Sequence, residues 1–292
     1  MNPRSVKFRE LFRNPPFVCM GVHDAISAKL AEEAGAKALF VSGFVASAVI
    51  AGKADIGILT QTEMFDHIRR ICRASTVPVF ADCDTGYGGI LETQRTMELW
   101  EEAGASCLHI EDQAMPKKCG HFAGKQLVSK DEMVMKLRAM VAARKDPNFF
   151  IVARTDAIAV NGLADALDRL EAYAATGVDG LYADAPESVE QLKAISQRLK
   201  PLGKPILFNM ARSGKSPYLS LDEAHALGFD FTICPIEPMF AMHKALKRMY
   251  ETFLQNGCST NAIADQCTPF DEFNRFVGLD ESIAVERKFG TL

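Results

Sequence analysis

Short apolar runs alternate with longer amphipathic segments along most of the chain. Turn residues bound four of these runs, at residues 17–22, 78–81, 149–153 and 205–208. Each run has the length of a buried strand, and a segment with helical spacing follows it. The pattern predicts strands and helices in alternation.

A repeated joint marks four more strands. The end of an Ala-rich helix, a glycine and an apolar run follow one another in AEEAGAKALFVSG from Ala31, WEEAGASCLHIED from Trp100, AYAATGVDGLYAD from Ala172 and AHALGFDFTICP from Ala224. Glycine suits the left-handed position that ends a helix, so each joint predicts a helix C-terminus and then a strand.

Together the two patterns give eight strands, each followed by a helix. Eight βα units within about 250 residues predict an α/β protein with a TIM (β/α)8 barrel rather than an open sheet. The expected helices cover residues 25–34, 61–74, 91–103, 130–145, 163–176, 188–199, 221–227 and 238–255.

No low-complexity linker divides the chain, so we expect one barrel over residues 1–255 and a C-terminal helical tail over residues 256–292. Phe270, Phe273 and Phe276 in the tail have helical spacing and form an apolar face. We expect a neighbouring subunit to cover this face, and packing on the chain's own barrel is the alternative.

The composition favours an enzyme that acts on small molecules. The 292-residue chain is 48% hydrophobic, with a formal net charge of −4. Its lysines and arginines are scattered, so neither nucleic acid nor an anionic membrane is an expected partner.

We also expect neither a membrane span nor export. The longest apolar stretch, residues 40–51, is interrupted and too short for a bilayer, and MNPRSVKFRELFRNPP lacks the apolar core of a signal peptide. The 8 cysteines form no CxxC pair, which favours reduced thiols. A cytoplasmic protein is expected, or an organellar one in a eukaryote.

Polar residues follow almost every predicted strand. In a TIM barrel these positions meet at the C-terminal face, where the chemistry of the fold takes place. Along the chain they are His23, Asp24, Ser42, Gly43, Asp82, Asp84, Glu111, Asp112, Arg154, Thr155, Asp156, Asp184, Glu187, Asn209 and Arg212.

Three of the acids indicate a metal site. Asp82 and Asp84 alternate across one residue, and Glu111 ends the adjacent strand. Carboxylates that converge in a partly buried site repel one another unless a cation neutralises them, and hard oxygen ligands suit Mg²⁺ or Mn²⁺. The alternative roles for these acids are a helix cap or a pair with a lysine.

Arg154 is placed to hold a carboxylate, or else to pair with Asp156 or Glu111.

The loop MPKKCGHFAGK, from Met115 to Lys125, places a cysteine among cationic residues. Together with neighbouring motifs it resembles the isocitrate lyase and phosphoenolpyruvate mutase superfamily. The segments PVFADCDTGYGG, LHIEDQAMPKKCGH, FIVARTDA and FNMARSGKSPYLS carry this resemblance, which covers nearly the whole chain. The KKCGH loop is typical of the carbon-carbon lyase branch, and the length is most similar to short members such as 2-methylisocitrate lyase and 2,3-dimethylmalate lyase.

The resemblance implies Mg²⁺-dependent cleavage of a 2-hydroxy dicarboxylate or tricarboxylate, with Mn²⁺ as a substitute metal. It implies that Asp84 touches the metal directly and that Asp82, Glu111 and Asp55 lie around it. It further implies a homotetramer that exchanges its last helices between subunits. The residues implied to hold substrate are Ser42, Gly43, Gly120, His121, Arg154 and Asn209, and further pocket candidates are Phe44, Asp184, Glu187 and Arg212.

By the same resemblance Cys119 is the general acid that protonates the anionic fragment after cleavage. We expect Lys117, Lys118 and His121 to surround the thiol and to screen the developing charge. Cationic neighbours also lower a thiol pKa, so a nucleophilic role is the alternative.

Three positions differ from the methylisocitrate lyase pattern: Asp184 and Arg212, where glutamate is typical, and Phe40, where tyrosine is typical. The substrate is therefore not fixed by the resemblance. An oxaloacetate acetylhydrolase, an oxaloacetate decarboxylase, a phosphonate mutase and a catalytically silent dicarboxylate sensor are the alternative functions.

Overall fold

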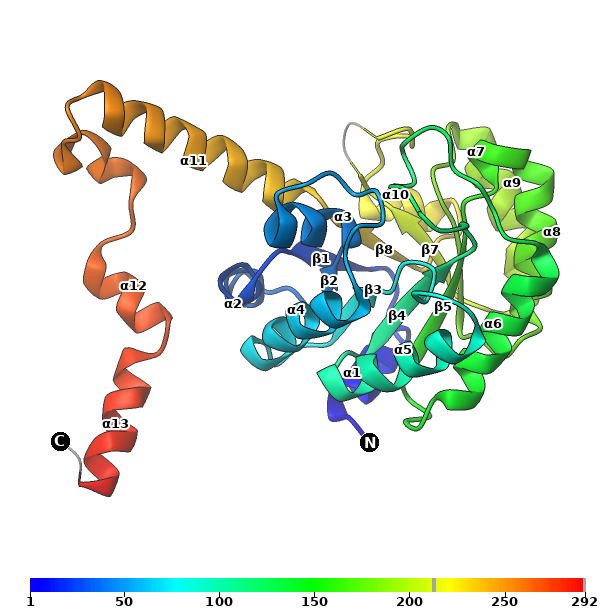
Figure 1. Cartoon of the computed structure of the whole chain (residues 1–292), viewed down its shortest axis with the longest axis horizontal. Helices are drawn as coiled ribbons and strands as arrows, with labels where there is room; N and C mark the ends of the chain where they lie inside the picture. Colours follow the sequence, from blue (N-terminus) through cyan, green and yellow to red (C-terminus); the bar gives the residue numbers. More distant parts are fainter. Residues whose placement is uncertain (212–213, 291–292) are drawn as a thin grey trace. The chain divides into compact units, whose positions relative to one another are not determined.

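The computed structural model describes residues 1–211 and 214–290. Its eight strands are all parallel and close into a barrel in chain order, with helices around the outside (Figure 1). This confirms the predicted TIM barrel. The strands are β1 Phe17–Val22, β2 Leu39–Val41, β3 Val79–Asp82, β4 Cys107–Glu111, β5 Phe150–Thr155, β6 Gly180–Ala183, β7 Ile206–Asn209 and β8 Phe231–Cys234.

The eight predicted helices lie where the sequence pattern placed them, within one or two residues at most ends. Local capping explains several starts: Asp24, Thr60 and Ser220 each accept a hydrogen bond from the backbone N–H three residues later, and the side chain there bonds back. The helices are α2 Ala25–Glu33, α4 Gln61–Ala74, α5 Ile90–Ala103, α6 Lys130–Ala143, α8 Leu163–Ala174, α9 Val189–Leu199, α10 Leu221–Ala226 and α11 Glu237–Gln255.

Five short elements were not predicted. Besides α1, which precedes the barrel, they lie in the connections between strands and helices. They are α1 Pro3–Leu11, α3 Gly43–Ala46, η1 Ser47–Ala51, α7 Ile158–Asn161 and η2 Lys200–Leu202.

Helix α1 supplies a plug for the barrel interior. Phe8 is fully buried, and its ring meets those of Phe17, Phe150 and Phe231 edge-on, with centroids 5.8, 5.4 and 6.4 Å apart. These phenyl rings belong to an apolar cluster inside the barrel, separate from the larger cluster between strands and helices. Polar side chains are therefore concentrated at the other end, where the strands finish.

The chain divides into two compact units, Met1–Met239 and Phe240–Leu292. We placed the domain boundary at residue 255, whereas the division into units falls near the start of α11. The second unit contains the rest of α11, η3 Thr260–Gln266, α12 Phe270–Phe276 and α13 Leu279–Phe289. None of its described residues is buried, so it has no apolar core of its own.

Among the helices of residues 1–211 and 214–290, none combines the length and the apolar composition needed to cross a bilayer.

Candidate active site

Two aspartates at the end of β3 lie at the centre of the site. The backbone N–H groups of Gly43 and Asp84 donate to the two carboxylate oxygens of Asp82 at 3.0 and 2.9 Å. A Cβ on residue 43 would lie 2.9 Å from Asp82 Oδ2 and 3.0 Å from Asp84 Oδ1, so this close approach requires glycine. The backbone thus holds a carboxylate pair at the mouth of the barrel.

The ammonium group of Lys117 lies between two acids of the site. Its Nζ is 2.6 Å from Asp84 Oδ1 and 2.7 Å from Asp55 Oδ1, and the residue is only 2% exposed. We expected Lys117 to screen charge at Cys119, and this stays a prediction; its direct contacts are with Asp84 and Asp55. The long side chain turns back into the barrel mouth, which the sequence of the loop does not reveal.

The acids of the site have different pKa shifts. Burial raises the pKa of Asp84 to about 6, and the charge of Asp82 adds to the shift while Lys117 opposes it. Burial also raises the pKa of Glu111 well above its usual range. For Asp82 the effect of burial is outweighed by cationic neighbours, and its pKa is lowered. Burial and neighbouring carboxylates thus disfavour the ionised forms of Asp84 and Glu111, and another cation at the site would oppose this effect.

The donor set fits a hard divalent ion that keeps several waters. Within the described part of the chain, no three His, Cys, Asp or Glu side chains form a ligand group that could hold a metal by itself. Mg²⁺ needs only one or two carboxylates, with water and substrate oxygens in the other positions. Glu111 Oε1 is buried without a hydrogen-bond partner among these residues. The arrangement of the four expected acids therefore suits a metal ion that one carboxylate contacts directly better than one that all four contact.

Arg154 on β5 is surrounded by three carboxylates. Its guanidinium group contacts Asp156 at 2.9 and 3.0 Å, Glu111 at 3.2 Å and Asp184 at 3.2 Å. Glu111 and Arg154 are directly opposite one another in the register of β4 and β5. The ion pairs that we considered as the alternative role for Arg154 are all present. A substrate carboxylate would have to share this guanidinium with them.

His109 belongs to the site although we did not select it from the sequence. Its Nε2 lies 3.6 Å from Asp82 Oδ1, and the ring of Phe40 stacks on it with centroids 5.8 Å apart. Burial lowers the pKa of His109 to about 4, so the imidazole is neutral at physiological pH. Strand alternation could have identified it, because His109 precedes Glu111 by two residues and so faces the same side.

Tyr182 also belongs to the site and was not selected from the sequence, although strand alternation could have identified it too. It precedes Asp184 by two residues, and its hydroxyl group donates a hydrogen bond to the Asp184 carboxylate. The Arg154 guanidinium carbon lies 5.3 Å from the centre of the Tyr182 ring. Asp184 is therefore held from two sides. Burial alone would raise its pKa, but Arg154, the other nearby cations and the Tyr182 hydrogen bond together keep the pKa of Asp184 well below its usual range.

The loop that carries Cys119 is closed at its base. Gln113 and Leu127 form an isolated antiparallel bridge, and the Gln113 side chain exchanges hydrogen bonds of 2.8 and 2.9 Å with the backbone of Lys118. The Lys118 ammonium donates to the carbonyl of Gly124 at 3.1 Å. Our expectation that Lys118 screens the thiol stays a prediction, and the ammonium group itself is directed to loop carbonyls.

The tip of this loop is packed onto the barrel mouth. The Cys119 N–H donates to the carbonyl of Asp55 at 3.1 Å, and Nδ1 of His121 accepts from the N–H of Lys215 at 3.2 Å. Between them, Gly120 allows a close approach to Asp184, the residue after β6. A side chain there would collide with the Asp184 carboxylate. The loop thus brings Cys119 to the barrel mouth.

The Cys119 thiol is suited to donate a proton. Burial raises its pKa to about 11, and the charges of Asp184 and Asp55 contribute to the shift. At neutral pH the group is therefore a protonated thiol rather than a thiolate. This favours the acid role over the nucleophilic alternative.

This shift predicts how Cys119 reacts with iodoacetamide. We expect alkylation at pH 7 about 100-fold slower than for an ordinary thiol, rising about tenfold per pH unit up to pH 10, because only the thiolate reacts. Peptide mass spectrometry measures the rate at each cysteine. The exposed Cys258 and Cys267 serve as internal references and should react faster than Cys119 at pH 7. Equal rates at pH 7 would contradict the raised pKa.

The other predicted site residues differ in position. Ser42 is buried at the end of β2, Phe44 follows it half-buried on α3, and Asn209 ends β7 with its Oδ1 buried and unpaired among described residues. Glu187 has a side chain that is 54% exposed and pairs with a lysine 3.1 Å away. Arg212 lies outside the described residues.

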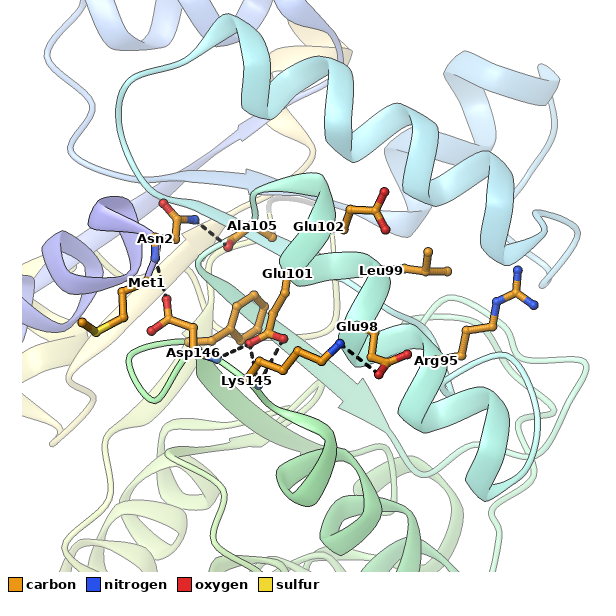
Figure 2. Close-up of a pocket in the computed structure, with 11 residues that line it drawn as sticks. Met1, Asn2, Arg95, Glu98, Leu99, Glu101, Glu102, Ala105, Lys145 and Asp146 are labelled. Atoms are coloured by element: carbon orange, nitrogen blue, oxygen red, sulfur yellow. Dashed lines mark hydrogen bonds and ion pairs between the residues drawn. The ribbon is translucent and has the colours of Figure 1, made fainter.

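A separate hollow of about 730 Å³ lies beside the N-terminal ends of the strands (Figure 2). Lys145 and Glu98 pair there at 3.2 Å, and Glu101 accepts the backbone N–H groups of Lys145 and Asp146. Several of its charged groups thus satisfy one another. The hollow includes none of the residues at the C-terminal ends of the strands.

Comparison with known proteins adds to this picture. The family model described as phosphoenolpyruvate phosphomutase matches residues 8–254. The chain is 38% identical to 2,3-dimethylmalate lyase of Eubacterium barkeri, over 98% of each chain. It is 36% identical to 2-methylisocitrate lyase of Halalkalibacterium halodurans, over 95% of this chain and 93% of the relative.

Solved structures show the same similarity. A crystal structure of 2,3-dimethylmalate lyase superposes with a TM-score of 0.91 at 34% identity, covering 98% of this chain and 95% of the other. Oxaloacetate acetylhydrolase in complex with 3,3-difluorooxalacetate gives a TM-score of 0.89 at 32% identity, covering 98% and 97%.

Proposed function

Because the chain belongs to the phosphoenolpyruvate mutase/isocitrate lyase superfamily, we propose that it cleaves the C2–C3 bond of a 2-hydroxy dicarboxylate or tricarboxylate. The substrate class is the 2-methylisocitrate or alkylmalate type, and the products are a 2-oxo acid and a second carboxylate. The observation that carries the proposal is the loop that seats Cys119 on the barrel mouth, with its N–H on the Asp55 carbonyl and Gly120 against the Asp184 carboxylate.

A magnesium ion, with manganese as a substitute, completes the site in this proposal. Asp84 would hold it directly, with Asp82, Asp55 and Glu111 around it. The ion supplies electrophilic polarisation of the substrate's 2-oxygen when bound. The unpaired Glu111 Oε1 and the close approach at Gly43 support this assignment.

Arg154 and the loop tip orient the substrate. The guanidinium group binds one substrate carboxylate, and the N–H groups near Gly43 and Gly120 are suited to bind others. His121 adds a polar side chain from the loop. The residues proposed to contribute further contacts are Ser42, Phe44, Asn209, Asp184, Glu187 and Arg212.

Cleavage then needs one proton to leave and one to arrive. We assign the role of accepting the hydroxyl proton to Glu111, whose Oε1 is buried and has no hydrogen-bond partner among the described residues. The electron pair of the C2–C3 bond passes to C3, and C2 becomes the carbonyl carbon of the 2-oxo acid. Cys119 donates its proton to C3, which completes the second product.

Hydrolysis of oxaloacetate to acetate and oxalate is the second candidate function. The likeness to oxaloacetate acetylhydrolase at a TM-score of 0.89 supports it. Phe40 lacks the hydroxyl group of the tyrosine that methylisocitrate lyases carry at this position. This difference is consistent with a substrate other than methylisocitrate.

A substrate panel tests the proposal and separates the candidates. The protein with Mg²⁺ is incubated with 2-methylisocitrate, 2,3-dimethylmalate, other 2-alkylmalates, isocitrate and oxaloacetate, and NMR identifies the products. A hydroxy acid converted to pyruvate or glyoxylate supports the lyase. If oxaloacetate is the only acid converted and the products are oxalate and acetate, the protein is a hydrolase instead of a lyase. If oxaloacetate gives pyruvate and carbon dioxide, it is a decarboxylase.

We also propose that the working protein is a homotetramer whose C-terminal helices pack on neighbouring subunits. Support comes from the second unit, in which Phe270 and Phe289 are 82% and 73% exposed and Leu254 on α11 is 67% exposed. Native mass spectrometry should show four chains per particle. A monomer at micromolar concentration would contradict the proposal.

A further inference from the structure

Lys125 is a buried lysine at the end of the cysteine loop that the proposed mechanism does not use. Its side chain is 1% exposed, and Nζ lies 3.0 Å from Asp156 Oδ1. The same ammonium group donates a hydrogen bond to the carbonyl of Gly120, the residue after Cys119. Lys125 therefore links the tip of the loop to an acid that follows β5.

Asp156 is shared between this lysine and Arg154. Its Oδ1 accepts from Lys125 Nζ and from Arg154 Nη2, both at 3.0 Å, and its Oδ2 accepts from Arg154 Nε at 2.9 Å. The Asp156 N–H donates to Asp112 at 3.0 Å, which fixes the acid in place. One carboxylate thus joins the loop cation and the candidate substrate-binding cation.

The remaining contacts at the tip of the loop are weaker. Cys119 and His121 each make one backbone hydrogen bond to another loop, at 3.1 and 3.2 Å, and neither involves an ion pair. Charge-assisted hydrogen bonds in buried surroundings are the stronger class. The position of the thiol therefore depends on the buried ion pairs that Lys117 and Lys125 make on either side of it in the loop.

The shared acid also determines how much of the Arg154 charge a ligand can use. Arg154 faces Glu111, Asp156 and Asp184 at the distances given above. A second cation on Asp156 neutralises part of that negative charge, so a ligand carboxylate meets less repulsion at the guanidinium group. Without Lys125, the three acids would compete with the ligand more strongly.

We propose that Lys125 is a positioning residue that couples the seating of the Cys119 loop to carboxylate binding at Arg154, through Asp156. Its part in substrate binding rests on the proposed function, whereas its part in holding the loop does not. When the loop seats, Lys125 reaches Asp156 and Arg154 becomes available to the ligand. When the loop lifts, Lys125 leaves Asp156, and the charge of the Asp156 carboxylate is then neutralised by Arg154 without help from the lysine.

Lys125→Met tests the coupling, with Lys130→Met as the matched control. Lys130 forms a surface pair with Asp168 at 2.6 Å, just beyond the loop. At pH 8 we expect iodoacetamide to alkylate Cys119 at least tenfold faster in K125M, and oxalate with Mg²⁺ to bind about tenfold more weakly by calorimetry. K130M should match the wild type within twofold. Lys125→Arg, which keeps the charge, should recover most of both effects.

The two measurements distinguish coupling from a structural role. If K125M speeds alkylation but leaves oxalate affinity unchanged, or leaves both at wild-type values, the coupling is refuted. If K125M does not fold, Lys125→Gln keeps a donor for Gly120 and removes the charge, and the same two changes are expected. A wild type that turns over none of the acids refutes the proposed function, while the alkylation rates still test Lys125.

Discussion

Replacing Cys119 by serine should lower turnover of the best hydroxy acid by about 10²- to 10⁴-fold, the range that general acid catalysis contributes. A hydroxyl group is a far weaker acid than a thiol, so the carbanionic fragment would lack its proton donor. The substitution is nearly isosteric and Cys119 is half-buried, so the free energy of unfolding should change by less than about 1 kcal/mol. Steady-state kinetics and urea unfolding measure the two effects.

Cys258→Ser is the matched control, because Cys258 is exposed and lies in the second unit. It should leave kcat and KM unchanged. Affinity for oxalate with Mg²⁺ should also stay within about threefold in Cys119→Ser, since the thiol acts after binding. Turnover by Cys119→Ser near the wild-type rate would remove the thiol from the mechanism.

Replacing Arg154 by methionine should affect both turnover and folding. Glu111, Asp156 and Asp184 would lose their shared buried cation, and such a loss costs about 3–5 kcal/mol of unfolding free energy. Turnover should fall below detection because the substrate carboxylate has no partner. Urea denaturation followed by circular dichroism measures the stability.

The pH dependence of this variant has a definite sign. In the wild type Arg154 helps to lower the pKa of Asp184, which stabilises the fold above the acid's unfolded pKa and is lost as the pH falls. In Arg154→Met the buried acids should titrate at raised pKa values instead. The folded variant then binds more protons than the unfolded chain. The loss of unfolding free energy relative to the wild type should therefore become smaller as the pH falls from 8 to 5.

The surface pair of Arg198 with Glu171 provides the control, since the Arg198 side chain is 59% exposed. Arg198→Met should cost no more than about 1 kcal/mol and show little pH dependence. An Arg154→Met protein as stable as Arg198→Met at pH 8 would contradict the charge balance described for the site.

The barrel could be predicted because the sequence shows both the short apolar runs of its strands and the helical spacing of the segments between them. The apolar runs and the glycine joints marked all eight strands. The structure adds capping residues such as Thr60 and Ser220 at the helix starts. Helix α1 was missed although Phe8, Leu11 and Phe12 have helical spacing. Its burial depends on the barrel interior that it fills, which local pattern cannot show.

The site was predictable where it follows from strand ends and less so where it depends on long side chains. The register of β4 and β5 pairs Glu111 with Arg154, as strand order implies. In contrast, Lys117 and Lys118 could not be placed from the loop sequence. Their ammonium groups lie several bonds from the backbone and go to whichever carboxylate or carbonyl the fold presents.

Bond cleavage with protonation at C3 is the central claim, and product analysis in D₂O tests it most directly. The wild-type protein with Mg²⁺ is given 2,3-dimethylmalate, and NMR follows the products. Cleavage between C2 and C3 should give pyruvate and propionate in equal amounts, with one deuterium on the propionate carbon that carried the broken bond. No product from this or any other hydroxy acid of the panel, with oxalate and acetate formed from oxaloacetate, would contradict the lyase.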